Sequence, residues 1–110
     1  MNDIIKCLRM INGIDSAYEA SKLLGISKSY MCLLESGVRV VTPELLEKIA
    51  SVYKIESSAI ISISEAYEQG LCNKLEVMKL IIDYYSAYYT AKNNSKYEDD
   101  EKSRHKSYNK

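Results

Sequence analysis

Few residues in this chain of 110 could perform catalysis or bind a metal ion, and they are widely separated. Cys7, Cys32 and Cys72 form no CxxC pair, whereas a zinc site or a disulfide framework needs closer and more regular spacing. The single histidine, His105, stands in a charged stretch near the C-terminus. The sequence contains no glycine-rich phosphate loop, nucleophile elbow or carboxylate pair on rigid elements, so we expect no metal, no cofactor and no enzymatic activity.

The strongest local pattern lies in residues 21–37, SKLLGISKSYMCLLESG. Gly25 tolerates positive φ and is suited to ending a first helix. Ser27 can cap a second helix, in which Met31 and Leu34 recur at i, i+3 spacing. Two short helices joined by a tight turn are typical of a helix-turn-helix, whose second helix can enter the major groove of DNA.

Further helices must position this pair, and helical periodicity with capping residues predicts five helices over residues 1–70. The expected capping residues, in chain order, are Asn2 or Asp3, Asp15 or Ser16, Ser27, Thr42, and Ser57 or Ser58. The fourth start is strengthened by Pro43 at the first helical position and by Glu44 near the positive end of the helix dipole.

Composition favours an all-α fold, because 46% of the residues are hydrophobic and only four glycines and one proline are present. The formal net charge is zero, so binding to nucleic acid would depend on lysines and arginines gathered on one face. No apolar run approaches the roughly 20 residues that cross a bilayer. The cysteine usage fits a reducing compartment, and we expect a soluble, cytoplasmic protein with no membrane partner.

Residues 71–92 are predicted to form one long helix, followed by a charged and mobile tail over residues 93–110. Apolar residues in that helix alternate in steps of four and three, the a/d heptad pattern of a coiled coil. This pattern favours a homodimer interface formed by Leu75, Met78, Ile82, Tyr85 and Tyr89. The alternative is that the tyrosines at positions 84, 85, 88 and 89 pack within one chain.

Residues 3–63 resemble the DNA-binding domain of the phage lambda repressor and Cro type, a five-helix bundle of many bacterial and phage regulators. The motifs that carry the resemblance are SKLLGIS, SYMCLLESG and TPELLEKIASVYKI. Such domains pair an arginine of the first helix with a glutamate near the end of the third. The resemblance therefore implies a structural ion pair between Arg9 and Glu35.

The resemblance also implies which residues would meet DNA. Base-reading positions correspond to Lys28, Ser29 and Leu33, with Cys32 beside them. Lys28 could donate to guanine O6 or N7, and Leu33 could contact only a thymine methyl. Phosphate-contacting positions correspond to Ser16, Ala17, Tyr18, Ser36, Val38 and Arg39. Ala17 and Leu33 depart from the family pattern, which commonly has polar residues at both places.

These features predict a transcriptional regulator that binds a specific double-stranded DNA site, with repression as the expected action. Residues 1–55 hold seven lysines and arginines and six acidic residues, a net charge of +1. So small an excess predicts modest affinity for each monomer, and hence a homodimer on a palindromic operator.

A second interpretation remains open, in which the same scaffold binds a protein. Cys32 and Leu33 would then belong to the interior or to a protein contact, while Lys28 and Arg39 would be ordinary solvated charges. A phage-encoded antagonist of host machinery or an antirepressor would fit this interpretation.

Overall fold

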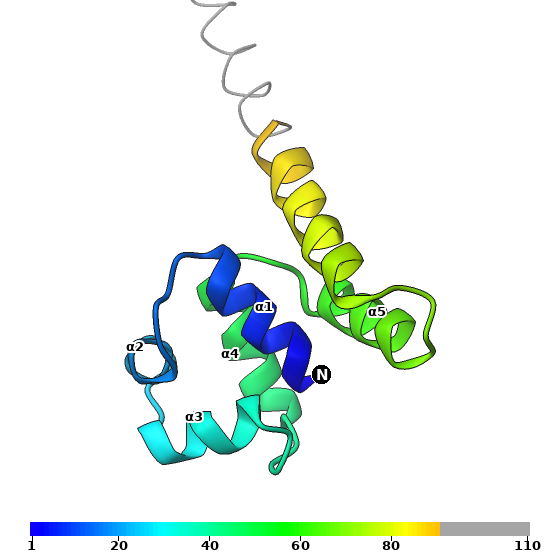
Figure 1. Ribbon diagram of the computed structural model, residues 1–110. Coiled ribbons are helices and arrows are strands. Elements are labelled where there is room, and N and C mark those ends of the chain that lie inside the picture. The colour runs from blue at the N-terminus through cyan, green and yellow to red at the C-terminus, as the bar shows by residue number, and fades with distance from the viewer. Residues whose placement is uncertain (91–110) are drawn as a thin grey trace, which may run out of the picture.

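The computed structural model describes residues 1–90, and this part of the chain is all-helical, as the composition predicted (Figure 1). Its labelled helices are α1 (Asn2–Ile11), α2 (Ala17–Leu24), α3 (Lys28–Glu35), α4 (Pro43–Tyr53) and α5 (Ser57–Glu68). A further helix, called here the C-terminal helix, occupies residues 74–90. The expected tail over residues 93–110 and the expected end of this helix at residue 92 lie outside the described residues.

Three helices begin at the predicted hydroxyl caps. The side chains of Ser16, Ser27 and Thr42 each accept a hydrogen bond from the backbone amide three residues later, at 3.2, 3.1 and 3.2 Å respectively. Each bond satisfies an amide that the first helical turn leaves unpaired. Pro43 stands at the first position of α4, as predicted.

Three other helix starts differ from the prediction. The capping residue of α1 is Met1 and that of α5 is Glu56, and neither makes a side-chain capping bond. The C-terminal helix begins at residue 74 instead of Leu71, because Asn73 and Glu76 form a reciprocal capping box. Asn73 Oδ1 accepts from the Glu76 amide at 2.8 Å, and Glu76 Oε1 accepts from the Asn73 amide at 3.1 Å.

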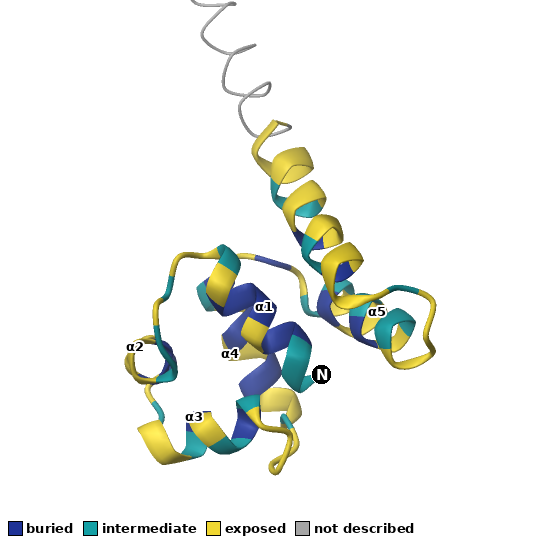
Figure 2. Cartoon of the chain, viewed as in Figure 1, coloured by how far each residue is buried: buried dark blue, intermediate teal, exposed yellow. Residues whose placement is uncertain are grey.

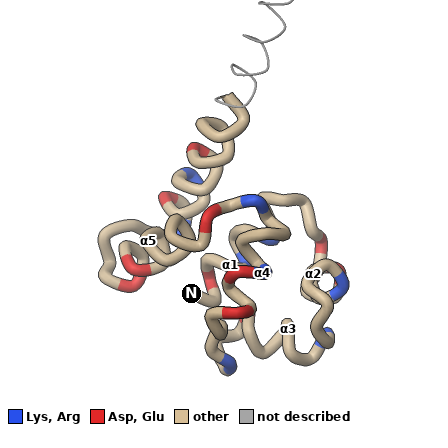
Figure 3. The backbone as a smooth tube through the Cα atoms, turned by 180° about the vertical axis from the view of Figure 1, so that it is seen from behind, with Lys and Arg blue, Asp and Glu red and all other residues tan. Residues whose placement is uncertain are grey.

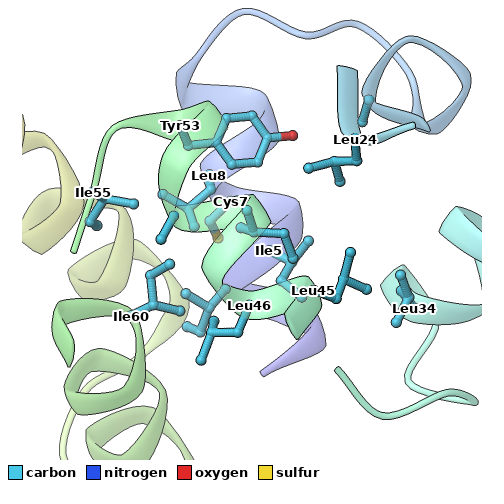
Figure 4. Close-up of a cluster of buried hydrophobic side chains, with 14 of the residues drawn as sticks. Ile5, Cys7, Leu8, Leu24, Leu34, Leu45, Leu46, Tyr53, Ile55 and Ile60 are labelled. Atoms are coloured by element: carbon cyan, nitrogen blue, oxygen red, sulfur yellow. The ribbon is translucent and has the colours of Figure 1, made fainter. Parts of the chain in front are cut away.

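The hydrophobic core lies between α1 and α4 and is completed from both sides (Figure 4). Leu24 of α2 and Leu34 of α3 reach it from one side, and Ile60 of α5 reaches it from the other. The C-terminal helix also contributes, since Val77 and Ile81 are fully buried. The helix pair formed by α2 and α3 is therefore held on a core shared by all six helices.

Two tyrosine hydroxyls fasten the C-terminal helix to the bundle. Tyr85 Oη donates to the backbone carbonyl of Tyr53 and accepts from Asn12 Nδ2 at 3.1 Å. Tyr84 Oη accepts from the backbone amide of Glu56 at 3.2 Å. The helix then projects away from the bundle, and most of its length is exposed (Figure 2).

The ion pair implied by the resemblance is present and buried. Arg9 Nε donates to Glu35 Oε2 at 2.8 Å, and the two side chains are only 10% and 8% exposed. Arg9 Nη1 also donates to the backbone carbonyl of Ile14 at 2.9 Å. One guanidinium thus joins α1, the connection that follows it and the last residue of α3.

Replacing one member of this pair should be costly. We expect Arg9→Met to lower the free energy of unfolding by about 3–5 kcal/mol, because Glu35 would be left as an uncompensated buried charge. Urea denaturation measures this value. The double variant Arg9→Met/Glu35→Leu is the control and should recover much of the loss; an equal loss in both variants would contradict the buried-charge explanation.

Tyr53 makes the stability of the fold depend on pH. Its hydroxyl is buried and has no hydrogen-bond partner among residues 1–90. Burial of the hydroxyl, which is the larger cause, and the negative charge of Glu35, which is the second, raise the pKa of Tyr53 from 10.0 to about 12. Above pH 10 the unfolded chain would therefore release this proton while the folded chain retains it.

We expect stability from this group to be complete below pH 10 and to be lost as the pH rises to about 12. Tyr53→Phe should remove this part of the alkaline destabilisation, while at pH 7 it should change stability by no more than about 1 kcal/mol. Urea denaturation of both proteins over the alkaline range measures the difference. Parallel pH profiles for the two proteins would rule out this role of Tyr53.

Candidate nucleic-acid interface

The turn between α2 and α3 consists of residues 25–27 and is fixed by backbone geometry. Gly25 has φ +67°, and the amide of Ile26 donates to the Ser21 carbonyl at 3.0 Å, which closes α2. A Cβ atom on Gly25 would lie 3.2 Å from Lys48 Nζ. Glycine therefore serves the backbone conformation and leaves room for the end of the Lys48 side chain.

The outer face of α3 presents the predicted base-reading residues. Met31 and Leu34 are fully buried and hold the inner face against the core. Lys28, Ser29 and Cys32 are exposed, whereas Leu33 is half-buried. These four positions are spaced i, i+1, i+4 and i+5, so they share one side of the helix. The structure thus brings them together outside the core, although Leu33 lies at the edge of the face.

The start of α2 supplies the first group of predicted phosphate-contacting residues. The Ser16 hydroxyl is occupied by its capping bond, and Ala17 is half-buried. Tyr18 is exposed, and Lys22 Nζ lies 4.2 Å from the centre of its ring. Lys22 also lies 4.0 Å from a carboxylate oxygen of Glu19, which offsets part of its positive charge.

The connection that follows α3 supplies the second group. Ser36 Oγ donates to the Leu33 carbonyl at 3.1 Å and so continues the end of the helix. Arg39 is exposed between two apolar neighbours, Val38 at 69% and Val40 at 84% exposure. The connection therefore offers one cation flanked by two valine side chains.

Positive charge stands at both ends of α3. Lys28 opens the helix and Arg39 follows it, and within residues 1–90 neither side chain makes an ion pair or hydrogen bond. Figure 3 shows lysine and arginine positions on α2, near the start of α3 and on the connection beyond its end. Both cations are available to an anion.

Sequence reasoning missed one cation of this surface. Lys48 belongs to α4, yet its ammonium group lies beside Gly25 at the α2–α3 turn. It borders a groove of about 450 Å³, which is lined by Ile26, Ser27, Tyr30, Thr42, Glu44, Leu45 and Lys48. No local pattern marks Lys48, because only the packing of α4 against α2 brings it there.

Within residues 1–90, no three histidine, cysteine or acidic side chains gather where they could hold a metal ion. No helix in the same range is long and apolar enough to cross a membrane.

The chain was compared with protein-family models, with curated proteins and with solved structures, and none of the three comparisons found a significant match.

The geometry of the turn can be tested by adding one methyl group. Gly25→Ala should lower the free energy of unfolding by about 1–2 kcal/mol, because alanine is strained at positive φ and its Cβ would displace Lys48. Urea denaturation measures the loss. Ser29→Ala on the exposed side of α3 is the control and should have little effect. Equal stability of the Gly25→Ala protein and the wild type would show that the turn is not constrained in this way.

Proposed function

We propose that this chain is a DNA-binding transcriptional regulator in which α2, the turn and α3 form a helix-turn-helix of the lambda repressor and Cro type. The observation that carries the proposal is the outer face of α3. The exposed Lys28, Ser29 and Cys32 occupy it, with the half-buried Leu33 at its edge, and Arg39 lies beyond its far end. A helix of this kind fits the recognition position in the major groove of double-stranded DNA.

The dimensions of α3 support this role. An α-helix with its side chains is about 10–12 Å across, and the major groove, about 12 Å wide, admits it. Lys28, at the leading end of the helix, can donate to guanine O6 or N7, and Ser29 can donate or accept. Leu33 can contribute an apolar contact to a thymine methyl. Cys32 adds only a weak donor.

The flanking groups would then hold the DNA backbone. Arg39 lies beyond the far end of α3, where a phosphate at the edge of the groove can reach it. The unpaired amides at the start of α2 and the ammonium group of Lys48 offer further phosphate contacts. The resulting positive surface is small, so we propose that a homodimer represses transcription from a palindromic operator.

The two cations flanking α3 should behave differently when removed. Lys28→Ala should change the preferred sequence, because it removes a base contact, whereas Arg39→Ala should weaken binding to all duplexes and reduce the salt slope by about 1. Fluorescence anisotropy on duplexes selected from a random library, at several salt concentrations, measures both effects.

Lys6→Ala removes an exposed cation of α1 and serves as the matched control, with binding close to wild type. If the best selected duplex and an unrelated duplex bind equally well at moderate salt, specific DNA recognition is excluded.

One observation favours a second function, the binding of a protein partner. Val38 and Val40 are 69% and 84% exposed on the connection after α3, and an exposed apolar pair suits a protein surface. Binding through these valines would depend little on salt, whereas DNA binding would weaken steeply as salt rises. The salt series above therefore discriminates between the two functions.

A further inference from the structure

The C-terminal helix carries a stripe of apolar side chains that the bundle leaves uncovered. Of the twelve large apolar side chains that are exposed within residues 1–90, six lie in residues 71–90. The stripe consists of Leu75, Ile82 and Tyr89, which are 76%, 48% and 48% exposed and recur every seven residues. Ile82 follows the buried Ile81, so the two point about 100° apart around the helix. The stripe thus lies on a different side from the face that closes the core.

A shallow hollow of about 300 Å³ lies beside the second half of this stripe. Its lining residues are Ile11, Asn12, Ile82, Tyr85, Ser86 and Tyr89. Ser86 is the smallest of them and lies along the helix between Ile82 and Tyr89. The first half of the stripe instead presents the long side chain of Leu75, seven residues before Ile82, while Met78, four residues before Ile82, is half-buried at its edge against the core.

These two halves are complementary about Ile82. Tyr89 follows Ile82 by seven residues and Ser86 follows it by four, which matches the spacing of Leu75 and Met78 before it. A two-fold axis at Ile82 would place Leu75 of one copy against Tyr89 of the other, and Met78 against Ser86. A self-complementary surface of this kind is what a symmetric dimer requires.

We propose that a second copy of this chain packs on this stripe with the two C-terminal helices antiparallel and Ile82 on the two-fold axis. The proposal rests on the homodimer of the proposed function and specifies its surface and its symmetry. It makes no use of a contact to DNA.

Charge favours the antiparallel arrangement over a parallel coiled coil. With Leu75 at an a position, Lys74 stands at g and Lys79 at e. In a parallel pair each g residue faces the e residue that lies five positions later in the partner, so Lys74 would meet Lys79 twice. In the antiparallel pair with Ile82 on the axis, Lys79 lies opposite Tyr85 and Lys74 lies opposite Thr90, and both partners are neutral. Only the parallel pair therefore brings like charges together.

Sedimentation of the full chain tests the dimer. The wild type should sediment as a dimer, and Ile82→Lys should weaken dimerisation about tenfold or more, because two ammonium groups would meet on the axis. Ile61→Lys replaces an exposed isoleucine of α5 and is the matched control, which should remain dimeric. Circular dichroism of each variant verifies that it is folded. A monomeric wild type, or an Ile82→Lys variant that dimerises normally, overturns the proposal.

Cross-linking tests the orientation. In a Cys32→Ser/Cys72→Ser background, a variant carrying Leu75→Cys is mixed with one carrying Tyr89→Cys and treated with a short bismaleimide. The antiparallel pair predicts cross-links between the two variants and few within either one. A parallel pair predicts efficient cross-links within each variant alone, and that result overturns the proposal.

The two proposals can fail separately. A dimer with the expected cross-links that binds no duplex from the random library would refute the proposed function and leave this interface standing. A monomer that binds a selected duplex specifically would refute the interface and the homodimer, and would leave specific DNA recognition by α3 standing.

Discussion

A buried ion pair between Arg9 and Glu35 determines where α3 stands on the bundle. Placing two charges in the interior is costly, and the cost is offset only when geometry and additional hydrogen bonds satisfy both groups. Here Arg9 also donates to the Ile14 carbonyl, and Asn2 Nδ2 donates to the backbone carbonyl of Glu35 at 3.4 Å. The first helix therefore holds the end of the third through both a side chain and the backbone. Because the inner face of α3 is fixed in this way, its outer face has one orientation relative to the rest of the molecule.

The helices could be predicted from the sequence where a side chain performs the capping, and less well where the backbone alone begins the helix. Ser16, Ser27 and Thr42 were readable because their hydroxyls accept from the third amide that follows. The start of α5 at Glu56 offers no such bond, so the neighbouring serines were misleading. The signal for the C-terminal helix was present, since Asn73 and Glu76 have capping-box spacing, but the apolar periodicity extended past it to Leu71.

The candidate site was predictable to the extent that it lies on one helix. The amphipathic pattern of α3 separates Met31 and Leu34 from the outward residues, so Lys28 and Ser29 could be placed outside from spacing alone. Lys48 could not, because its position beside Gly25 depends on how α4 crosses α2. Which side of the C-terminal helix contacts the bundle, and which side stays exposed, could also not be predicted from the sequence. Two apolar faces overlap in it, and the heptad pattern contains both residues that contact the bundle, such as Tyr85, and residues that do not, such as Leu75.

Because one side of the C-terminal helix packs on the bundle, its exposed stripe is fixed in position relative to the outer face of α3. Val77 and Ile81 anchor one side of the C-terminal helix in the core, and the hydroxyls of Tyr84 and Tyr85 bond to the backbone around the end of α4. The helix is thus fixed to the same core on which α3 rests, and the exposed stripe has a defined direction relative to the outer face of α3. In a symmetric dimer formed through the stripe, the separation of the two α3 helices would then be set by this docking and not by a flexible linker. If the proposed dimer binds DNA, half-site spacing would follow from that separation, and the packing of Val77 and Ile81 would then determine the operator geometry as much as any residue on α3.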